Sequence, residues 1–162
     1  MSEETMPISL TVNGERVARS VSVRQHLVDF LRTELGLTGT HLGCEHGSCG
    51  ACSVRVDGVL VRGCLMLAVQ CDGARVDTIE GVADTDEIAD LQQAFIARNA
   101  LQCGYCTPGM LLTAQELLAR GGVPSRELIR THLSGNYCRC TGYQAIVDAV
   151  EAVAQARAGT KQ

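Results

Sequence analysis

The nine cysteines are the feature that most constrains what this 162-residue chain can fold into. An odd number cannot be fully paired in disulfides, and nine exceed what packing alone requires. The first ten residues hold two glutamates and no basic segment followed by an apolar one, so we expect no secretory signal and no oxidising compartment. We therefore expect a soluble, cytoplasmic protein whose reduced thiols bind metal.

Composition argues against several classes of function. Aromatic residues make up 3% of the chain, tryptophan is absent, and the net charge of −4 comes without a lysine or arginine cluster. We therefore expect no nucleic-acid partner, and no membrane span because every apolar run is far shorter than a bilayer. The sequence has no Walker loop, no dinucleotide-binding glycine motif and no nucleophile–base arrangement, so we expect no substrate chemistry on this chain.

The first part of the chain has the pattern of a hairpin followed by a helix. Apolar and polar residues alternate over 8–12, and Asn13-Gly14 is the pair best suited to a tight hairpin turn. After the return strand, Ser22 is the expected cap of a helix whose leucines recur every four residues. That helix is expected to end near Gly36.

A second hairpin is expected after a glycine-rich stretch over 36–50. Its strands cover 52–56 and 59–61 around the Asp57-Gly58 turn, and a last strand follows over 74–79. Two hairpins and one helix predict a small β-grasp-like α+β domain over residues 1–80.

Beyond that point the apolar residues recur with helical period. The acidic, turn-forming residues 80–87 are the expected linker between two halves. Residues 81–162 are then predicted to form an all-α domain. Its expected helices cover 88–99, 109–119, 125–133 and 143–156.

Four cysteines in the first half have the spacing of a plant-type [2Fe–2S] site. Cys44, Cys49 and Cys52 form a C-x4-C-x2-C run, and Cys64 follows across the hairpin as the closing ligand. A four-thiolate zinc site is the alternative, but such sites usually join two short-spaced pairs and only one is present here. His41 and His46 flank the run, yet four available thiolates make a Rieske-type histidine ligation unnecessary.

Three glycines accompany this run. Gly43, Gly47 and Gly50 are expected to let backbone N–H groups turn toward the sulfides of a cluster, where side chains would obstruct the approach. Such hydrogen bonds favour the reduced, more negative form of the cluster.

A second cysteine set lies in the helical half. Each of its pairs is expected at a helix start, with Thr107 as a cap before Pro108 and Thr141 with Gln144 as a capping box. Negative charge is stabilised at a helix amino terminus. Spacing alone favours an iron–sulfur site but leaves a zinc site and a redox dithiol open. The four residues are Cys103, Cys106, Cys138 and Cys140.

The ninth cysteine and the remaining histidines have simpler expected roles. Cys71 precedes a turn at Asp72-Gly73, and we expect a small, partly apolar residue near a strand end rather than a redox group. His26 and His132 are expected on helix surfaces.

Three segments together resemble the small iron–sulfur subunit of the xanthine oxidase family of molybdenum hydroxylases. They are GCEHGSCGAC (43–52), QCGYCTPGM (102–110) and GNYCRCTGY (135–143). The resemblance implies an α+β protein in which a plant-type ferredoxin-like domain precedes an all-α four-helix domain, each binding one [2Fe–2S] cluster. It implies Cys44, Cys49, Cys52 and Cys64 as ligands of the first cluster, and Cys103, Cys106, Cys138 and Cys140 as ligands of the second.

The resemblance also implies an enzyme complex in which this chain carries electrons. A large subunit would hold molybdopterin in its cytosine dinucleotide form, contacted here by Gln102 and Cys140, and a medium subunit would hold FAD. The resemblance implies that substrate would be hydroxylated at molybdenum with oxygen from water, and that electrons would pass singly through the helical-domain cluster and then the ferredoxin-like cluster to FAD. The assembly is expected to be a heterotrimer or a dimer of heterotrimers.

The substrate pocket would lie on the large subunit, so the sequence bears on it only weakly. Between Cys44 and Cys49 the loop reads Glu-His-Gly-Ser and lacks the Asp-Thr-Ser-His insert that is typical of the small subunits of specialised aerobic carbon monoxide dehydrogenases. We therefore expect an N-heteroaromatic, aldehyde or aromatic acyl-CoA substrate. The alternatives are a carbon monoxide dehydrogenase small subunit, a stand-alone two-cluster ferredoxin and a zinc-binding interaction module.

Overall fold

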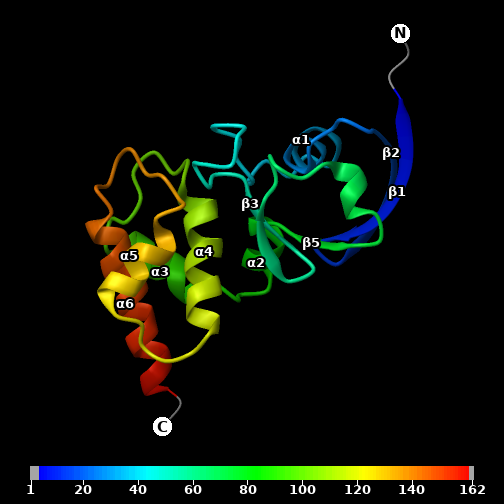
Figure 1. Cartoon of the computed structure of the whole chain (residues 1–162). Helices are drawn as coiled ribbons and strands as arrows, with labels where there is room; N and C mark the ends of the chain where they lie inside the picture. Colours follow the sequence, from blue (N-terminus) through cyan, green and yellow to red (C-terminus); the bar gives the residue numbers. More distant parts are fainter. Residues whose placement is uncertain (1–3, 161–162) are drawn as a thin grey trace.

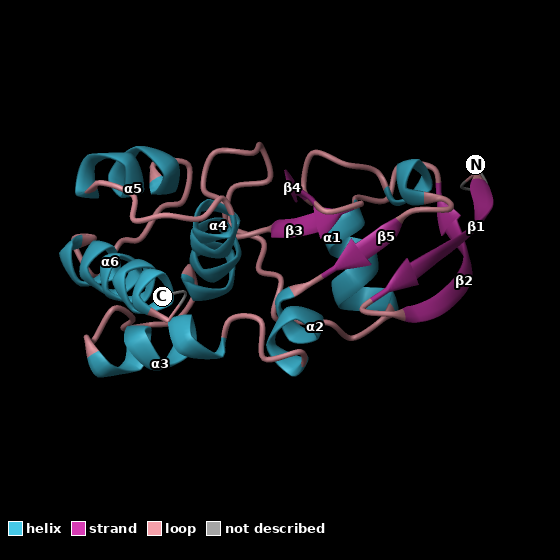
Figure 2. Ribbon diagram, turned by 90° about the horizontal axis from the view of Figure 1, so that it is seen from below, coloured by secondary structure: helices cyan, strands magenta, loops and turns pink. Residues whose placement is uncertain are grey.

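The computed structural model describes residues 4–160 (Figure 1). Residues 1–3, part of the amino-terminal stretch discussed above, and residues 161–162 lie outside the described part. No helix within 4–160 is long and apolar enough to cross a membrane. Figure 2 shows the strands gathered at one end of the molecule and helices α3–α6 at the other.

A five-stranded mixed sheet in the order β2-β1-β5-β3-β4 forms the first half. Its strands are β1 (Thr5–Val12), β2 (Glu15–Ser22), β3 (Ser53–Val56), β4 (Val59–Arg62) and β5 (Arg75–Asp77). Both expected hairpins are present, since β1 pairs with β2 and β3 pairs with β4 in antiparallel register. β5 closes the sheet between them, parallel to β1 and antiparallel to β3.

The turn residues explain why the hairpins form where they do. Asn13 and Gly14 have φ of 50° and 84°, and Asp57 and Gly58 have φ of 50° and 81°. Positive φ at both central positions is the geometry of the tightest hairpin turn, which Asn-Gly and Asp-Gly adopt at the lowest cost.

A short helix packs its apolar side on this sheet. Helix α1 (Leu27–Asp29) continues directly into the π-helical turn η1 (Phe30–Glu34), and Gly36 follows with φ of 70°. Phe30 and Leu31 are fully buried against the inward-facing residues of β1. The alternation seen in the sequence therefore places one face of β1 in the core.

The expected helix cap at Ser22 is wrong. The helix begins at Leu27, with His26 before it and no side-chain cap, while the Ser22 hydroxyl accepts a hydrogen bond from the Arg24 amide at 3.3 Å. Ser22 therefore supports the turn that ends β2. His26 is exposed, as expected.

The second half is helical, as expected. Helices α3 to α6 form the bundle and α2 lies at its edge against β5. A short 3-10 turn, η2 (Ala68–Cys71), precedes β5. The helices are α2 (Ile79–Asp84), α3 (Ala89–Ala97), α4 (Thr107–Ala119), α5 (Arg126–Leu133) and α6 (Gln144–Gly159).

The expected linker over 80–87 is wrong in part, because helix α2 covers most of it. Ile79 and Val82 from this helix are buried in the core of the helical half. Glu80 from the same helix accepts a hydrogen bond from the Gly39 amide at 2.7 Å, so it also holds the first half. The segment therefore packs on both halves, and the division at residue 80 stays a prediction.

Candidate iron–sulfur sites

The first four-cysteine group forms on the loop between η1 and β3. Cys44 and Cys49 are partly exposed on this loop, whereas Cys52 at its end is buried. Cys64 follows β4 and is buried beside Cys52 and Val28 of helix α1. The β3–β4 hairpin therefore brings the distant fourth cysteine back to the other three.

Backbone amides donate hydrogen bonds to the Cys44 sulfur. The Cys49 amide donates to the Cys44 Sγ at 3.4 Å. Hydrogen bonds from the backbone of His46, and then of Cys49 and Ser48, lower the pKa of the Cys44 thiol to about 6 despite some opposing burial. The loop is therefore built to hold negative charge on sulfur.

The buried sulfurs of the group influence one another. Burial is the main cause that raises the pKa of the Cys52 thiol to about 12, and the side chains of Cys64 and Cys49 contribute to the rise. Several thiolates in one buried space repel one another. The positive charge of a bound metal offsets that repulsion, so thiols that coordinate a metal are deprotonated.

The second four-cysteine group lies where α4 and α6 begin. Cys103 and Cys140 are exposed and their sulfurs are 3.6 Å apart. Cys106 and Cys138 are partly buried and interact with each other. Burial is the main cause that raises the pKa of Cys106 to about 12, and Cys138 adds to it.

Thr141 supports this second group, although not in the expected way. Its amide and hydroxyl both donate to the Cys138 Sγ, at 3.4 and 3.1 Å. Burial opposes this effect, but these hydrogen bonds lower the pKa of Cys138 below its ordinary value. The expected capping box with Gln144 is wrong, because Tyr143 precedes α6 and the Gln144 side chain contacts Arg130.

Tyr143 adopts an unusual backbone conformation beside the same cysteines. Its φ is 68°, which is costly for a bulky residue, and its hydroxyl accepts a hydrogen bond from the Cys138 amide at 2.9 Å. The expected cap at Thr107 is also wrong, since Cys106 itself precedes helix α4 and Pro108 lies in the first turn. Cys106 therefore sits directly at the helix amino terminus.

The sulfurs come in four pairs. Side-chain interactions pair Cys44 with Cys49, Cys52 with Cys64, Cys103 with Cys140, and Cys106 with Cys138. All nine cysteines lie in the described part of the chain and none forms a disulfide. Within residues 4–160 no three donor side chains meet at a point suited to a single metal ion. Two thiolate pairs per group fit a cluster of two irons.

A side chain added at each of the three loop glycines would meet a different neighbour. A Cβ on Gly43 would lie 3.2 Å from the Cys49 sulfur, so this glycine leaves room at the thiolates. A side chain on Gly47 would instead meet Leu65, and one on Gly50 would meet residues of the helical half. At Gly43 the obstacle is therefore a cysteine sulfur, whereas at Gly47 and Gly50 it is other protein atoms, and the role of all three glycines at the sulfides of a cluster stays a prediction.

The two residues expected to contact the pterin both lie at the surface. Gln102 is exposed immediately before Cys103, and Cys140 is exposed beside it. The structure thus brings the two residues to one surface, and their role stays a prediction.

The remaining cysteine and histidines lie outside the sulfur pairs. Cys71 is completely buried in the core of the first half, where burial raises the pKa of its thiol to about 11. His46 contacts the Cys44 carbonyl through Nδ1. The expected surface position of His132 is wrong, since its side chain is 14% exposed and faces Glu116 of helix α4.

Two tyrosines of the helical half contact the first cysteine loop, and the sequence did not indicate either of them. The Tyr137 amide donates to the Cys49 carbonyl oxygen at 2.8 Å. Tyr105 stacks on His41 with ring centroids 4.5 Å apart, and its hydroxyl donates to the Leu42 carbonyl at 2.7 Å. Each tyrosine is adjacent to a cysteine of the second group, which is the one signal that could have indicated them.

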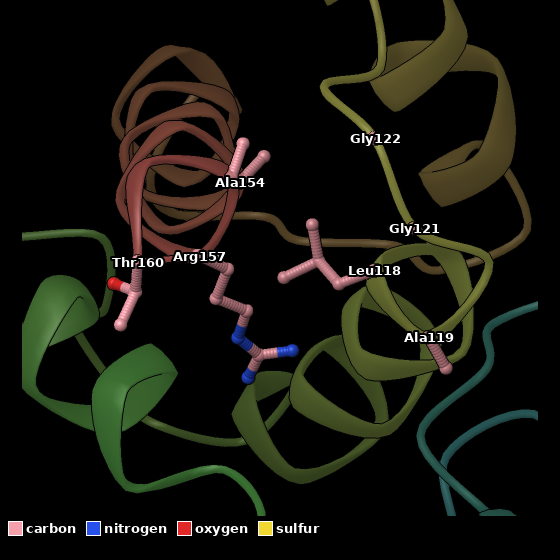
Figure 3. Close-up of a pocket in the computed structure, with 8 residues that line it drawn as sticks. Leu118, Ala119, Gly121, Gly122, Ala154, Arg157 and Thr160 are labelled. Carbon is pink, nitrogen blue, oxygen red and sulfur yellow. The ribbon is translucent and has the colours of Figure 1, made fainter. Parts of the chain in front are cut away.

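A cavity at the far end of the helical half is not part of these sites. It has a volume of about 410 Å³ between the ends of α4 and α6, where Leu118, Ala154 and Arg157 line it (Figure 3). No cysteine lines this cavity.

Comparison with known proteins agrees with this geometry. Residues 10–78 match the family model described as "2Fe-2S iron-sulfur cluster binding domain" and residues 78–151 match the "[2Fe-2S] binding domain" model. Each match contains one of the two cysteine groups. The chain therefore has two domains that bind [2Fe–2S] clusters.

Relatives and a solved structure cover nearly all of the chain. Caffeine dehydrogenase subunit gamma from Pseudomonas sp. (strain CBB1) is 52% identical over 149 residues, covering 90% of this chain and 89% of the relative. Nicotine 6-hydroxylase small subunit from Paenarthrobacter nicotinovorans is 49% identical over 147 residues, covering 91% and 88%. Quinoline 2-oxidoreductase from Pseudomonas putida 86 has a crystal structure that matches with a TM-score of 0.89 at 47% identity, covering 97% of both chains.

Proposed function

Because the chain belongs to the small iron–sulfur subunits of the xanthine oxidase family of molybdenum hydroxylases, and so is part of an oxidoreductase, we propose that it relays single electrons between two partner subunits. The donor is a molybdopterin centre, in its cytosine dinucleotide form, on a large subunit. The acceptor is FAD on a medium subunit. The two sets of four cysteines named above are the proposed ligands of the two clusters.

The observation that carries this proposal is the hydrogen bond between the two cysteine loops. Cys49 belongs to the first group, and Tyr137 directly precedes Cys138 of the second group. One hydrogen bond of 2.8 Å therefore connects the backbones that hold the two groups. Two purely structural metal sites would have no use for such a direct connection, whereas an electron relay requires its centres to be close.

The exposed side of the second group supports a protein partner at that surface. Cys103 and Cys140 are exposed there, and so are Tyr105 and Tyr137, with 47% and 58% of their surface accessible. Large exposed aromatic side chains are typical of surfaces that another protein covers. We assign this face to the large subunit, with Gln102 and Cys140 directed at the pterin.

The chain's own residues hold and tune the proposed clusters. When bound, each cluster takes up one electron and passes it on. Cys52 and Cys64 are buried, which shields the first site from water. The amides of Cys49 and Thr141 donate to thiol sulfurs, and such hydrogen bonds stabilise the more negative, reduced state.

We propose an N-heteroaromatic substrate for the complex. The names of three similar proteins refer to caffeine, nicotine and quinoline, and all three are nitrogen heterocycles. An aldehyde is the second candidate, since the PaoA iron–sulfur subunit of an aldehyde oxidoreductase from Escherichia coli is 41% identical over 163 residues.

Metal analysis and copurification test the proposal. Two [2Fe–2S] centres predict about four irons and about four acid-labile sulfides per chain, with visible absorption that bleaches on reduction. The native complex should purify with a molybdenum-containing subunit and a flavin-containing subunit. Zinc without sulfide would contradict the proposal and favour an interaction module, and a chain that purifies alone with both clusters would indicate a stand-alone ferredoxin.

The substrate assignment has its own assay. Reduction of the complex should be fastest with N-heteroaromatic compounds, slower with aldehydes and absent with carbon monoxide. Fast reduction by carbon monoxide would identify the small subunit of a carbon monoxide dehydrogenase instead.

A further inference from the structure

Between the two cysteine groups lies a tightly packed seam, which we define as Gly50, Gly109, Gly135 and Asn136. Gly50 comes from the first cysteine loop, Gly109 from helix α4, and the other two from the segment before Cys138. None of the four residues is a proposed cluster ligand. The seam nevertheless lies between the two ligand-bearing loops.

Asn136 is the central polar residue of the seam. It is 1% exposed, and its Oδ1 accepts hydrogen bonds from Arg62 and from the Thr113 hydroxyl, both at 3.2 Å. Its Nδ2 donates to the Gly50 carbonyl at 3.5 Å. A buried amide that contacts both halves at once fixes their relative position, because moving either half would leave its polar atoms unpaired.

Arg62, the last residue of strand β4, contacts Gly135 and Asn136 from the first half of the chain. Its guanidinium donates to the Ser53 hydroxyl within its own hairpin and to the Gly135 carbonyl at 2.8 Å, in addition to Asn136. Arg62 lies two residues before Cys64, and Asn136 lies two residues before Cys138. The planar, multidentate guanidinium therefore connects the two cysteine-bearing segments rigidly.

The seam has no space in which to adjust. A Cβ on Gly50 would lie 2.6 Å from the Gly135 carbonyl and 2.7 Å from the Asn136 Cγ, and one on Gly109 would collide with the Gly50 carbonyl. Backbone thus packs directly on backbone. The side chains of Arg62 and Asn136 form hydrogen bonds with the polar atoms around it.

We propose that Arg62 and Asn136 are positioning residues that hold the two clusters at a fixed separation and orientation by keeping the Tyr137 amide on the Cys49 carbonyl. This role rests on the proposed function, because it presupposes that both cysteine groups carry clusters. It goes beyond that function because neither residue binds a cluster.

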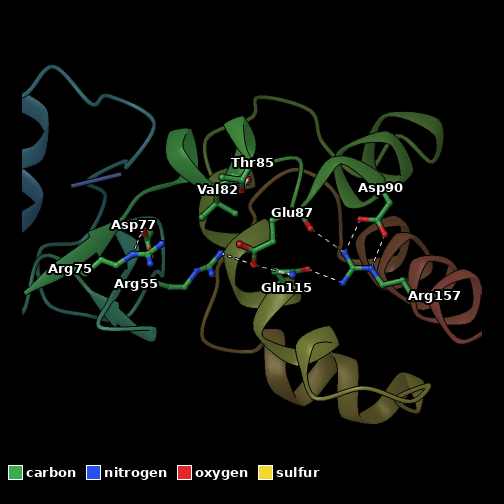
Figure 4. A network of polar contacts seen from close by, with 9 residues as sticks. All are labelled: Arg55, Arg75, Asp77, Val82, Thr85, Glu87, Asp90, Gln115 and Arg157. Carbon is green, nitrogen blue, oxygen red and sulfur yellow. Dashed lines mark hydrogen bonds and ion pairs between the residues drawn. The ribbon is translucent and has the colours of Figure 1, made fainter. Parts of the chain in front are cut away.

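The same hairpin provides a matched control. Arg55 on β3 also reaches the helical half, where it pairs with Glu87 at 2.9 Å, and Glu87 in turn contacts Gln115 (Figure 4). None of these three residues contacts the seam in the described structure. Arg55→Gln therefore removes a contact between the halves without touching the cysteine loops.

The experiment measures the magnetic interaction between the two reduced clusters in the full-length chain loaded with iron and sulfide. Iron content is measured first in the wild type, Arg62→Gln, Asn136→Ala and Arg55→Gln. Both centres are then reduced with dithionite, and the spin–spin splitting is recorded by low-temperature electron paramagnetic resonance. This splitting depends on the distance and orientation between the clusters, and a general loss of stability would not alter it.

We expect loss of the splitting in Arg62→Gln and Asn136→Ala, and an unchanged splitting in Arg55→Gln. Arg62→Lys should recover part of the splitting, and it replaces Arg62→Gln in the comparison if that variant fails to bind iron. Wild-type splitting in every Arg62 and Asn136 variant that holds both clusters would overturn the inference, as would an equal loss in Arg55→Gln. A wild-type chain without iron and sulfide would overturn the proposed function itself, and this inference with it.

Discussion

Replacing Gly50 by alanine should destabilise the protein more than the same change at Gly58. Both glycines have positive φ, 76° and 81°, so alanine costs about 1–2 kcal/mol of backbone strain at either position. Only at Gly50 would the new Cβ also meet protein atoms, the Gly135 carbonyl and Asn136, whereas nothing lies within 4 Å at Gly58. Gly58→Ala therefore isolates the effect of the collision.

The collision should add about 1–3 kcal/mol, the usual cost of overpacking, because the obstacle is backbone and cannot rotate away. For a chain of this size that corresponds to a midpoint lower by roughly 3–9 °C than in Gly58→Ala. Thermal unfolding followed by circular dichroism at one scan rate measures the difference in cluster-loaded protein. Equal midpoints in the two variants would refute the close packing of the two halves at Gly50.

Three further predictions concern the cysteines, the pair of Asp90 with Arg157, and the Tyr105 hydroxyl. Cys106→Ser should lose about half of the bound iron, while Cys71→Ser should keep all of it, and iron loss in the second variant would refute the ligand assignment. Arg157 lowers the pKa of the Asp90 carboxyl, chiefly by hydrogen bonding, so Asp90→Asn should lower the unfolding midpoint at pH 7. That difference should begin to shrink as the pH falls below about 4, where the carboxyl becomes protonated in the unfolded chain, and should be lost once the pH passes the lower pKa of the folded protein. A difference that grows in acid would contradict the assignment. Tyr105→Phe removes a hydroxyl that reaches the other cysteine loop and should cost about 0.5–1.5 kcal/mol in denaturant unfolding, with no change in iron content.

Local signals in the sequence were sufficient for most of the fold. Asn13-Gly14 and Asp57-Gly58 predicted both hairpins because few other pairs adopt positive φ twice in succession. Helices α3 to α6 followed from apolar periodicity. Helix α2 was missed because its acidic, glycine-containing sequence resembles a turn, and it is helical because Ile79 and Val82 are buried by the rest of the protein.

The helix caps show where local signals fail. Thr107 and Thr141 both stand at positions where the sequence suggests a cap, yet Cys106 and Tyr143 precede the helices. Thr141 donates to the Cys138 sulfur instead. The Thr141 hydroxyl could cap the start of helix α6 or donate to the Cys138 sulfur, and in the structure it donates to the sulfur. The sequence alone does not show which of these two partners is preferred.

The sequence was enough to predict the two cysteine groups, because each contains cysteines only a few residues apart, and the spacing of the first group is typical of a plant-type [2Fe–2S] site. How the two groups are placed relative to each other follows instead from the folded structure. Asn136 and Gly50 lie 86 residues apart and Arg62 and Gly135 lie 73 apart, yet they meet at one seam. Such contacts depend on how two independent cores pack together, and no local pattern of residues encodes that packing.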